Sequence, residues 1–342
     1  DRRTLLLRWG GAWAAAAGGA VARAADADPP WPVVLATPGP GSAVSAIPEL
    51  AQRLGADREA GLALRLKFTG GGGIAIREIL SGNAQCGVFG ITAAMHENLR
   101  GPQLVALAAV ENRAPLSLMV RPELKGRVRS VADLTGRVLG VHSNSMTTTT
   151  NGQQFMVALL RQHGLTMDAV RVVAAGQSWD TQSAALRSGL VDAVISEEPF
   201  GLRMEQAGLA FALVRLGLPA QPLGLTGEGF LRGALMATRA LVSSHPELAQ
   251  RLVQMVQRTL AWRRSHSVEE LVLKLGLTGA EAQAFGAMLH RYPQQFSADG
   301  RFSAAQMAQT DAFFQDSSAG QPDAARLRVA DMLVDTWAGR AP

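Results

Sequence analysis

The sequence predicts an α/β fold of two similar lobes, each built on a parallel-rich sheet flanked by helices. Two observations lead to this prediction. A fixed order of strand, glycine loop, helix and strand occurs twice, about a hundred residues apart, and the chain of 342 residues is longer than one typical domain. After residue 240 the apolar spacing becomes purely helical, so a group of helices is expected to cover the sheets.

The first copy of this unit spans residues 62–90. The apolar run LALRLKF predicts a strand, TGGGG interrupts it, and IAIREIL has the apolar spacing of a helix. The pair SG at 81–82 ends that helix, and CGVFG is typical of a short buried strand. A strand at 32–39 and a helix at 43–54 come before the unit, so the first lobe alternates strands and helices, the order that produces a parallel sheet.

The second copy spans residues 170–196 and repeats the same order. VRVVA predicts a strand, AGQSWD a loop, TQSAALR a helix, SG its end, and DAVIS the next strand. A strand at 136–143 and a helix at 151–164 again come first. The repetition predicts that the second lobe has the architecture of the first.

The last hundred residues predict helices. Ser243 or Ser244 is expected to cap the helix PELAQRLVQMVQRTLAW, whose leucines fall on one face. Further helices are expected near 279–291, 303–316 and 322–338. These helices offer no pattern of chemically active residues, so they are interpreted as a cover for the sheets.

The first 24 residues predict an export signal. They begin with paired arginines, continue with an apolar stretch of small residues, and end in the A-x-A pattern ARA. The run RRTLLL resembles a twin-arginine motif, so the mature protein is expected in the periplasm after cleavage. The apolar stretch 9–22 is too short to span a bilayer, and no stable membrane anchor is expected.

The charge and the cysteine content exclude several classes of function. Removal of residues 1–24 leaves 29 basic and 27 acidic residues, so the mature chain is nearly neutral and has no basic stripe for nucleic acid. Cys86 is the only cysteine, which excludes an internal disulfide and a cysteine metal cluster. Stability must therefore come from buried apolar surface, and the protein is expected to be a monomer.

Motifs for cofactor binding and catalysis are missing. GPGSAV at 39–44 has valine where the third glycine of a dinucleotide-binding loop belongs, and there is neither a phosphate-binding P-loop nor a nucleophile elbow. The six histidines lack metal-ligand spacing and are interpreted as surface or satisfied core residues. Glu197 and Glu198 are adjacent on a predicted strand, where neighbouring side chains point opposite ways, so at most one faces a cleft. No catalytic residue, metal or cofactor is expected.

Glycine and hydroxyl residues instead recur at the carboxyl ends of the predicted strands, the edge where open α/β sheets bind ligands. Glycines let a ligand approach backbone N–H groups, and hydroxyls offer further hydrogen bonds. Each serine or threonine taken singly could equally be a helix cap, and each glycine a turn. The candidate ligand-binding residues are Thr37, Gly39, Ser42, Gly71, Gly72, Gly73, Phe89, Gly90 and Thr92 in the first lobe, and Ser143, Asn144, Ser145, Thr147, Thr148, Gln177 and Glu198 in the second.

The side chains at this edge favour an organic ligand over an inorganic anion. The predicted loops contain no arginine or lysine, so the ligand is expected to be a small organic molecule with a polar or anionic head. Glu198, if it faces the cleft, would repel an anion and favour a hydroxyl, amide or amine. Phe89, Trp179 or Phe200 could stack on a flat ligand, although a core role is the preferred interpretation of each phenylalanine.

Several segments together resemble the solute-binding proteins of ABC importers for sulfonate, nitrate and taurine, a family that also contains thiamine-pyrimidine-synthase-like proteins. The segments that carry the resemblance are TGGGGIAIREILSGNAQCGVFG (69–90), VRSVADLTGRVLGVHSNS (128–145), HGLTMDAVRVV (163–173), ALRSGLVDAVISEEPF (185–200) and ATRALVSSHPELAQRLV (237–253).

This resemblance implies a type II periplasmic-binding-protein fold with the ligand between the lobes. The chain would cross between lobes near 110–118 and 226–237, which gives a first lobe of residues 28–113 plus 236–342 and a second lobe of 114–235. The implied function is capture of a small solute by hinge closure and its delivery to an ABC permease and its ATPase.

Two other functions remain open on the same fold. One is an enzyme related to the thiamine-pyrimidine synthases, which resemble this chain but carry a cysteine-rich motif, whereas Cys86 stands alone here. The other is a periplasmic input protein that passes its ligand state to a membrane sensor.

Overall fold

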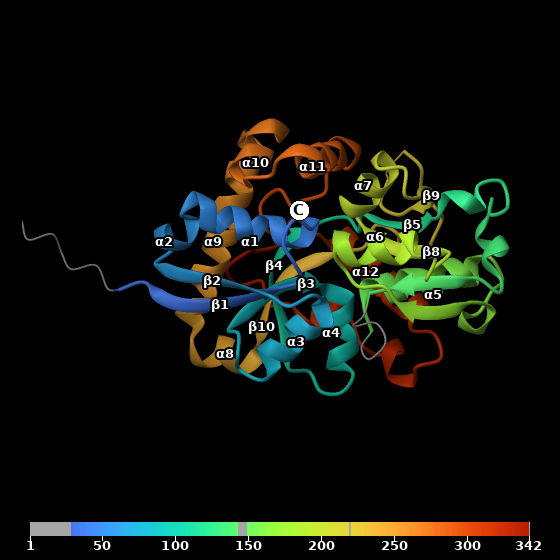
Figure 1. The fold of residues 1–342 in the computed structure, drawn as a ribbon. Coiled ribbons are helices and arrows are strands. Elements are labelled where there is room, and N and C mark those ends of the chain that lie inside the picture. The colour runs from blue at the N-terminus through green and yellow to red at the C-terminus, as the bar shows by residue number, and fades with distance from the viewer. Residues whose placement is uncertain (1–28, 143–148, 219, 342) are drawn as a thin grey trace, which may run out of the picture.

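Two lobes, each with one five-stranded mixed sheet and flanking helices, make up the computed structural model (Figure 1). The structure describes residues 29–142, 149–218 and 220–341. The fold class predicted from the sequence is confirmed. The expected export signal at 1–24 lies outside the described residues, and within the described part no helix is long and apolar enough to cross a bilayer.

The first sheet has the strand order β2-β1-β3-β10-β4. β1 pairs in parallel with β2 and β3, since helices carry the chain back between these strands. β10 lies antiparallel between β3 and β4 because it enters this sheet from the other lobe. The strands are β1 Trp31–Thr37, β2 Leu62–Phe68, β3 Cys86–Gly90, β4 Leu104–Glu111 and β10 Gly233–Thr238.

The second sheet, β7-β6-β8-β5-β9, repeats this topology. β6 pairs in parallel with β7 and β8, and β5, which enters from the first lobe, lies antiparallel between β8 and β9. The strands are β5 Leu116–Val120, β6 Val138–Val141, β7 Arg171–Ala174, β8 Ala193–Glu197 and β9 Phe211–Arg215. The repeated unit seen in the sequence therefore corresponds to two lobes of equal connectivity.

Helices follow the strands in the predicted order. The first lobe has α1 Ala43–Leu54, α2 Ala56–Glu59, α3 Gly72–Leu80 and α4 Ile91–Asn98, and the second has α5 Asn151–Gln162, α6 Trp179–Arg187 and α7 Phe200–Gln206. The C-terminal helices are α8 Arg239–Ser244, α9 Pro246–Ser265, α10 Val268–Lys274, α11 Gly279–Arg291 and α12 Ala304–Ser317. Short 3-10 turns occupy Pro122–Leu124, Val131–Leu134, Met167–Ala169, Pro322–Ala325 and Val329–Met332.

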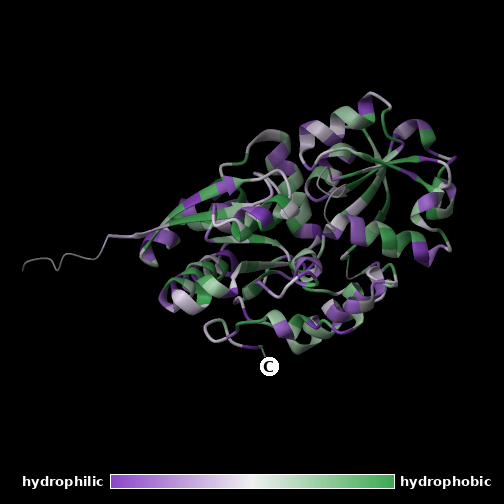
Figure 2. Ribbon diagram, turned by 90° about the horizontal axis from the view of Figure 1, so that it is seen from below, coloured by the Kyte–Doolittle hydropathy of each residue, from purple (hydrophilic) through white to green (hydrophobic). Residues whose placement is uncertain are grey.

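The core of the first lobe lies between its sheet and α1 and α9. Ile47 and Leu50 of α1 pack with Leu248 and Leu252 of α9, and all four side chains are buried. Full burial of one such side chain contributes roughly 1.5–3 kcal/mol. α1 ends where Gly55 adopts the left-handed conformation (φ 79°) and its N–H bonds the last carbonyls of the helix. Figure 2 shows hydrophobic residues along the strands and on the helix sides turned toward them.

Helix α12 contributes to both lobes. Phe313 is buried in the cluster of the second lobe, where its ring stacks on Phe230 at 4.0 Å between centroids, and the next residue, Phe314, is buried in the first-lobe cluster. An ion pair of 3.0 Å between Arg161 of α5 and Asp316 of α12 adds a second contact with the second lobe. The C-terminal helices are therefore more than a cover for the first lobe.

Three details differ from the sequence predictions. Residues 233–235, assigned to the second lobe, pair with β3 and β4 of the first sheet, so the second crossover is the segment 216–232. The cap of α9 is His245, because the Ser244 hydroxyl donates to the Ala240 carbonyl at the end of α8 (2.9 Å). The expected helix at 322–338 is only two 3-10 turns, because the chain then bridges β4 through the Val334 N–H and the Ala106 carbonyl (2.9 Å).

Candidate functional site

The carboxyl end of β3 in the first lobe meets the start of α5 in the second. The Thr92 hydroxyl donates to Gln154 Oε1 across this junction at 2.5 Å, and both side chains are buried. At Gly90 an added Cβ would lie 2.5 Å from Cγ and 2.7 Å from Nδ2 of Asn151, so any larger residue here would force the Asn151 side chain or the lobes to move. The glycine predicted at this strand end has a role between the lobes.

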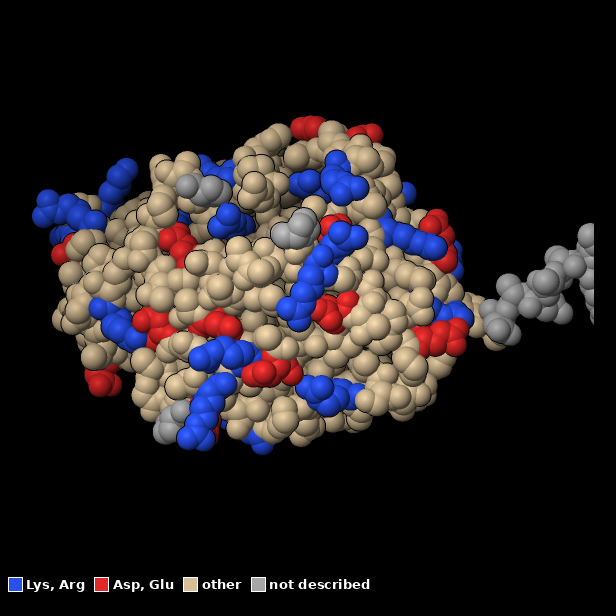
Figure 3. All heavy atoms as spheres, turned by 180° about the vertical axis from the view of Figure 1, so that it is seen from behind, with Lys and Arg blue, Asp and Glu red and all other residues tan. Residues whose placement is uncertain are grey.

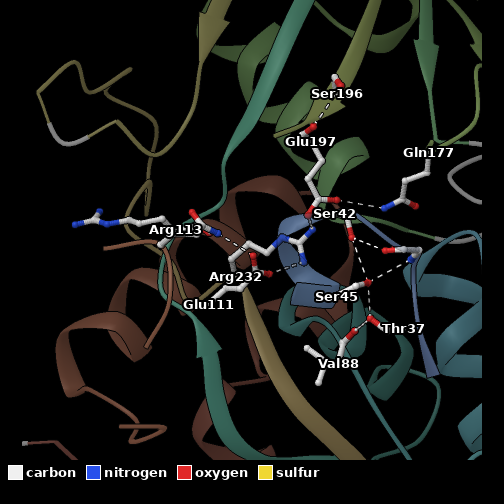
Figure 4. Close-up of polar contacts among 12 residues, drawn as sticks. Thr37, Ser42, Ser45, Val88, Glu111, Arg113, Gln177, Ser196, Glu197 and Arg232 are labelled. Carbon is white, nitrogen blue, oxygen red and sulfur yellow. Dashed lines mark hydrogen bonds and ion pairs between the residues drawn. The ribbon is translucent and has the colours of Figure 1, made fainter. Parts of the chain in front are cut away.

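A buried cluster of charges also links the lobes (Figure 4). Arg232, directly before β10, donates to Glu111 Oε2 at 3.1 Å and to Glu197 Oε1 at 2.5 Å. Glu111 ends β4 in the first lobe, whereas Glu197 ends β8 in the second. The Gln177 amide nitrogen donates to the other Glu197 oxygen at 3.4 Å. One guanidinium therefore bridges two carboxylates that belong to different lobes.

Burial and these charges shift several pKa values. Burial opposes the charge of Arg232, but the carboxylates of Glu197 and Glu111 outweigh it and raise the pKa of Arg232. Burial raises the pKa of Glu111 to about 7, against the opposing effect of Arg232. Burial and then the charge of Arg232 lower the pKa of His142 to about 4, so this ring is neutral near pH 7. The cluster of Arg232, Glu111 and Glu197 carries a net charge near −1 when Glu111 is ionised and near 0 when Glu111 is protonated.

Two connected cavities lie between the lobes. The inner cavity, of about 20 Å³, has room for a group of about one water molecule and is lined by Gly72, Gly73, Gly90, His142, Asn151 and Arg232, among others. The outer cavity, of about 500 Å³, is lined by residues that include Gly39, Ser42, Phe68, Trp179, Phe200 and Arg203. Pro38 and Gln177 line both, so the two form one cleft.

Polar atoms without a partner gather around the inner cavity. Among the described residues, His142 Nε2, Asn151 Nδ2, Gln177 Oε1 and Arg232 Nε are buried and have no hydrogen-bond partner. An unpaired buried polar atom costs roughly 1–3 kcal/mol, so four beside one cavity favour the binding of a polar group there. The arrangement is suited to binding a small polar group through several hydrogen bonds.

The predicted glycines and hydroxyls divide between the cleft and its supporting structure. Thr37 is buried behind the cleft, where its hydroxyl bonds Ser45 Oγ at 2.9 Å and the Val88 carbonyl at 3.2 Å (Figure 4). Gly71 caps α3. The cleft-lining members are Gly39, Ser42, Gly72, Gly73, Gly90 and Gln177. The predicted residues Ser143, Asn144, Ser145, Thr147 and Thr148 lie outside the described residues.

Two predicted ligand contacts are wrong. The ring of Phe89 is fully buried in the first-lobe core, because its strand has both faces covered. The Glu198 carboxylate is fully buried inside the second lobe, where it pairs with Arg215 and accepts from Ser117 Oγ at 2.5 Å and the Leu202 N–H at 2.7 Å. Glu197 instead faces the other lobe, in agreement with the expectation that only one of the adjacent glutamates can do so.

Five residues of the site were not predicted from the sequence: Arg232, Glu111, Glu197, His142 and Asn151. One signal was present: the arginine in FLRGALMA interrupts an apolar strand pattern, and a buried arginine must have a partner. His142 is neither a surface residue nor a satisfied core residue, as the histidines were interpreted, because its Nε2 has no partner within the described residues.

The described residues contain no group of three or more histidine, cysteine, aspartate or glutamate side chains that could hold a metal ion. Cys86 is fully buried, and burial raises the pKa of its thiol far above its ordinary value. On the face seen in Figure 3, basic and acidic side chains are interspersed. These features leave the interlobe cleft as the candidate site.

Comparison with known proteins defines the class to which this cleft belongs. Residues 49–270 match the family model described as NMT1/THI5 like, and the chain belongs to this family. No curated protein matches the chain. The resemblance to periplasmic solute-binding proteins of ABC importers, predicted from the sequence, is thereby confirmed at the level of the family.

Three solved structures are similar to this chain. A protein of Bordetella bronchiseptica RB50 is 21% identical with a TM-score of 0.78, over 90% of this chain and 95% of that one. The alkanesulfonate-binding protein SsuA of Xanthomonas axonopodis pv. citri, bound to MOPS, is 19% identical with a TM-score of 0.68, over 90% and 100%. The desulfurization enzyme DszB is 20% identical with a TM-score of 0.54, over 91% and 96%. At these identities the likeness establishes the fold.

Proposed function

We propose that this protein is an exported receptor that captures a small organic solute in the interlobe cleft and delivers it to an ABC-type importer. The observation that carries the proposal is the group of four buried polar atoms around the inner cavity, three from the second lobe and one from Arg232, which directly precedes β10 of the first sheet; all four are unpaired among the described residues. A solute that pairs them would bind both lobes at once and stabilise their contact.

The magnitudes fit capture of a dilute solute. A micromolar dissociation constant requires about 8 kcal/mol. Neutral hydrogen bonds contribute about 0.5–1.5 kcal/mol each and those to charged groups about 1.5–3 kcal/mol, so four polar contacts plus apolar packing in the outer cavity reach that range. Closure of the two lobes around the solute would supply the exclusion of water that makes these contacts effective.

The remaining parts of the proposal concern export and partners. The twin-arginine-like segment at 1–24 supports export to the periplasm as a cleaved, unanchored monomer. Membership of the NMT1/THI5-like family and the fold shared with a solute-binding protein support an ABC permease and its ATPase as partners. A sensor protein as partner is the alternative that a test of uptake would reveal.

A binding role is preferred over catalysis, although the fold also occurs in the enzyme DszB. Cys86 is buried with its pKa raised, so it is a poor nucleophile. Glu198 is bound to Arg215 in the second lobe, and the two carboxylates that do meet at the site, Glu111 and Glu197, are both bound to Arg232, which holds them in an ion-paired bridge. The unpaired polar atoms around the inner cavity can bind a solute through hydrogen bonds alone, so the site explains binding without any chemical reaction.

A thermal-shift screen of the purified exported protein against small organic solutes tests the proposal. A solute at 100 times its dissociation constant stabilises the folded protein by about 2.7 kcal/mol, which raises the melting temperature by several degrees. Asn151→Ala removes an unpaired donor and should reduce the shift at the same solute concentration, whereas the exposed control Asn83→Ala should keep it in full. If no solute shifts the wild-type protein, or if the shift is equal in both variants, the proposed site is wrong.

A further inference from the structure

We propose that the solute is an uncharged molecule with an amide-type edge attached to a flat ring, and that anions are excluded. This inference rests on the proposed function and specifies the solute class for the same cleft. It is carried by two observations: the pairing of the charges between the lobes, and the kinds of free hydrogen-bonding atom around the inner cavity.

The first observation is that the positive charge of the cleft is already neutralised. Both terminal nitrogens of Arg232 bind carboxylates, at 3.1 Å to Glu111 and 2.5 Å to Glu197, and the arginine is 4% exposed. A solute anion beside Arg232 would therefore also lie beside two acidic groups. In the outer cavity Arg203 is likewise paired with Glu281 at 3.1 Å, and Asp180 adds a negative charge. The balance of charge disfavours an anionic head.

The second observation concerns which atoms are free. The amide nitrogen of Gln177 donates to the Glu197 carboxylate, which can only accept, so Gln177 Oε1 is the atom left as a free acceptor. Asn151 Nδ2 and Arg232 Nε are free donors, among the residues that the structure describes. A carboxylate or sulfonate would leave the acceptor unpaired, and an amidinium would leave both donors unpaired. An amide edge, with one carbonyl and one N–H, pairs with both kinds of atom.

The outer cavity fits a flat ring. Its walls include Trp179, Phe68 and Phe200, with Phe68 44% exposed. The Arg203 guanidinium lies 4.1 Å from the centroid of the Trp179 ring, so two planar groups are already stacked at this wall. The volume of about 500 Å³ lies in the range of small-molecule sites, whereas the inner cavity of about 20 Å³ admits one polar atom of the head. Gln177 lines both cavities, so the amide edge is expected where they adjoin, with the ring in the outer cavity.

Matched ring compounds that differ only in the head test this inference. Benzamide, benzoate and benzamidine, and the same three heads on naphthalene, are titrated by isothermal calorimetry into the wild-type protein. At least one amide is expected to bind at least ten times more tightly than its carboxylate and its amidine. Glu197→Gln frees Arg232 from one carboxylate and should improve carboxylate binding at least tenfold, whereas Glu247→Gln, on the exposed face of α9, should leave the order unchanged.

The ring is tested separately by Trp179→Ala, which should weaken amide binding about tenfold, with partial recovery in Trp179→Phe. If a carboxylate or amidine binds the wild-type protein as tightly as its amide, or if no member of the series binds, the inference is overturned, even where Glu197→Gln fails to fold. The proposed function would still stand if another solute shifts the wild-type protein in the wider screen. If that screen also finds none, both fail.

Discussion

The close approach of Gly90 to Asn151 gives the sharpest prediction, made by Gly90→Ala. Gly90 has φ −64° and ψ 124°, which alanine adopts without strain, so the new methyl group acts only through its neighbours. That Cβ would lie 2.5 Å from Asn151 Cγ and closer still to its Oδ1, whereas real contacts are essentially never below 3.0 Å, so the lobes must separate or the Asn151 side chain must repack. Such overpacking costs roughly 1–3 kcal/mol.

This cost lowers the ratio of closed to open protein roughly 5- to 150-fold, and apparent solute affinity falls by up to that factor, in proportion to the fraction that is closed. Small-angle scattering should show a larger radius of gyration for Gly90→Ala, and urea unfolding a lower stability. Adding Asn151→Ala removes the clashing atoms and should restore both. Gly39→Ala, after another strand and with nothing within 4 Å of the new Cβ, is the steric control and should keep wild-type scattering and wild-type stability in urea. A Gly90→Ala protein with wild-type scattering and stability would refute the interlobe contact.

Three further predictions concern stability. Arg215→Met leaves the buried Glu198 carboxylate without its charged partner and should lower the free energy of unfolding in urea by about 3–5 kcal/mol. Adding Glu198→Gln should restore most of that stability. A loss below about 1 kcal/mol would contradict the buried pair. The pKa of His142 is about 4 in the folded protein and 6.5 in the unfolded chain, so the folded protein binds fewer protons and loses stability as the pH falls from 6.5 to 4. His142→Gln should remove about 3 kcal/mol of this loss. Parallel curves of stability against pH for the variant and the wild type would contradict the burial of a neutral His142. Phe313→Ala should lower the free energy of unfolding by about 3–5 kcal/mol because the ring is fully buried. The control is Phe68→Ala, whose ring is partly exposed. If Phe313→Ala loses less stability than this control, α12 does not anchor the second lobe.

The local parts of the fold could be predicted because short stretches of sequence determine them. The strand, glycine loop and helix of 62–90 differ in apolar period, and the same is true of 170–196. The alternation of side chains along a strand also predicted that Glu197 and Glu198 point apart. Which of them faces the other lobe depends on Arg215, which lies on β9 and approaches β8 only in the folded sheet.

The charged part of the site could not be predicted for the same reason. Glu111, Glu197 and Arg232 are separated by 35 to 121 residues and meet only because β10 and β5 each cross into the sheet of the other lobe. The apolar spacing in the sequence predicts which face of a strand is buried, but it does not predict which distant strand lies beside it. Thr37 shows that a position can be predicted without its contacts. Its place after a strand was predicted, but its hydroxyl bonds Ser45 of α1 and the Val88 carbonyl of β3 behind the cleft and does not face a ligand.

A crystal structure of the protein with the best solute from the thermal-shift screen tests the central claim most directly. The solute is predicted between the lobes, with its polar head within about 2.7–3.2 Å of Asn151 Nδ2 and Gln177 Oε1 and its ring in the outer cavity. A solute whose polar head lies away from Asn151 and Gln177, for example in the cavity of about 420 Å³ beside His96 and Arg100, would contradict the account.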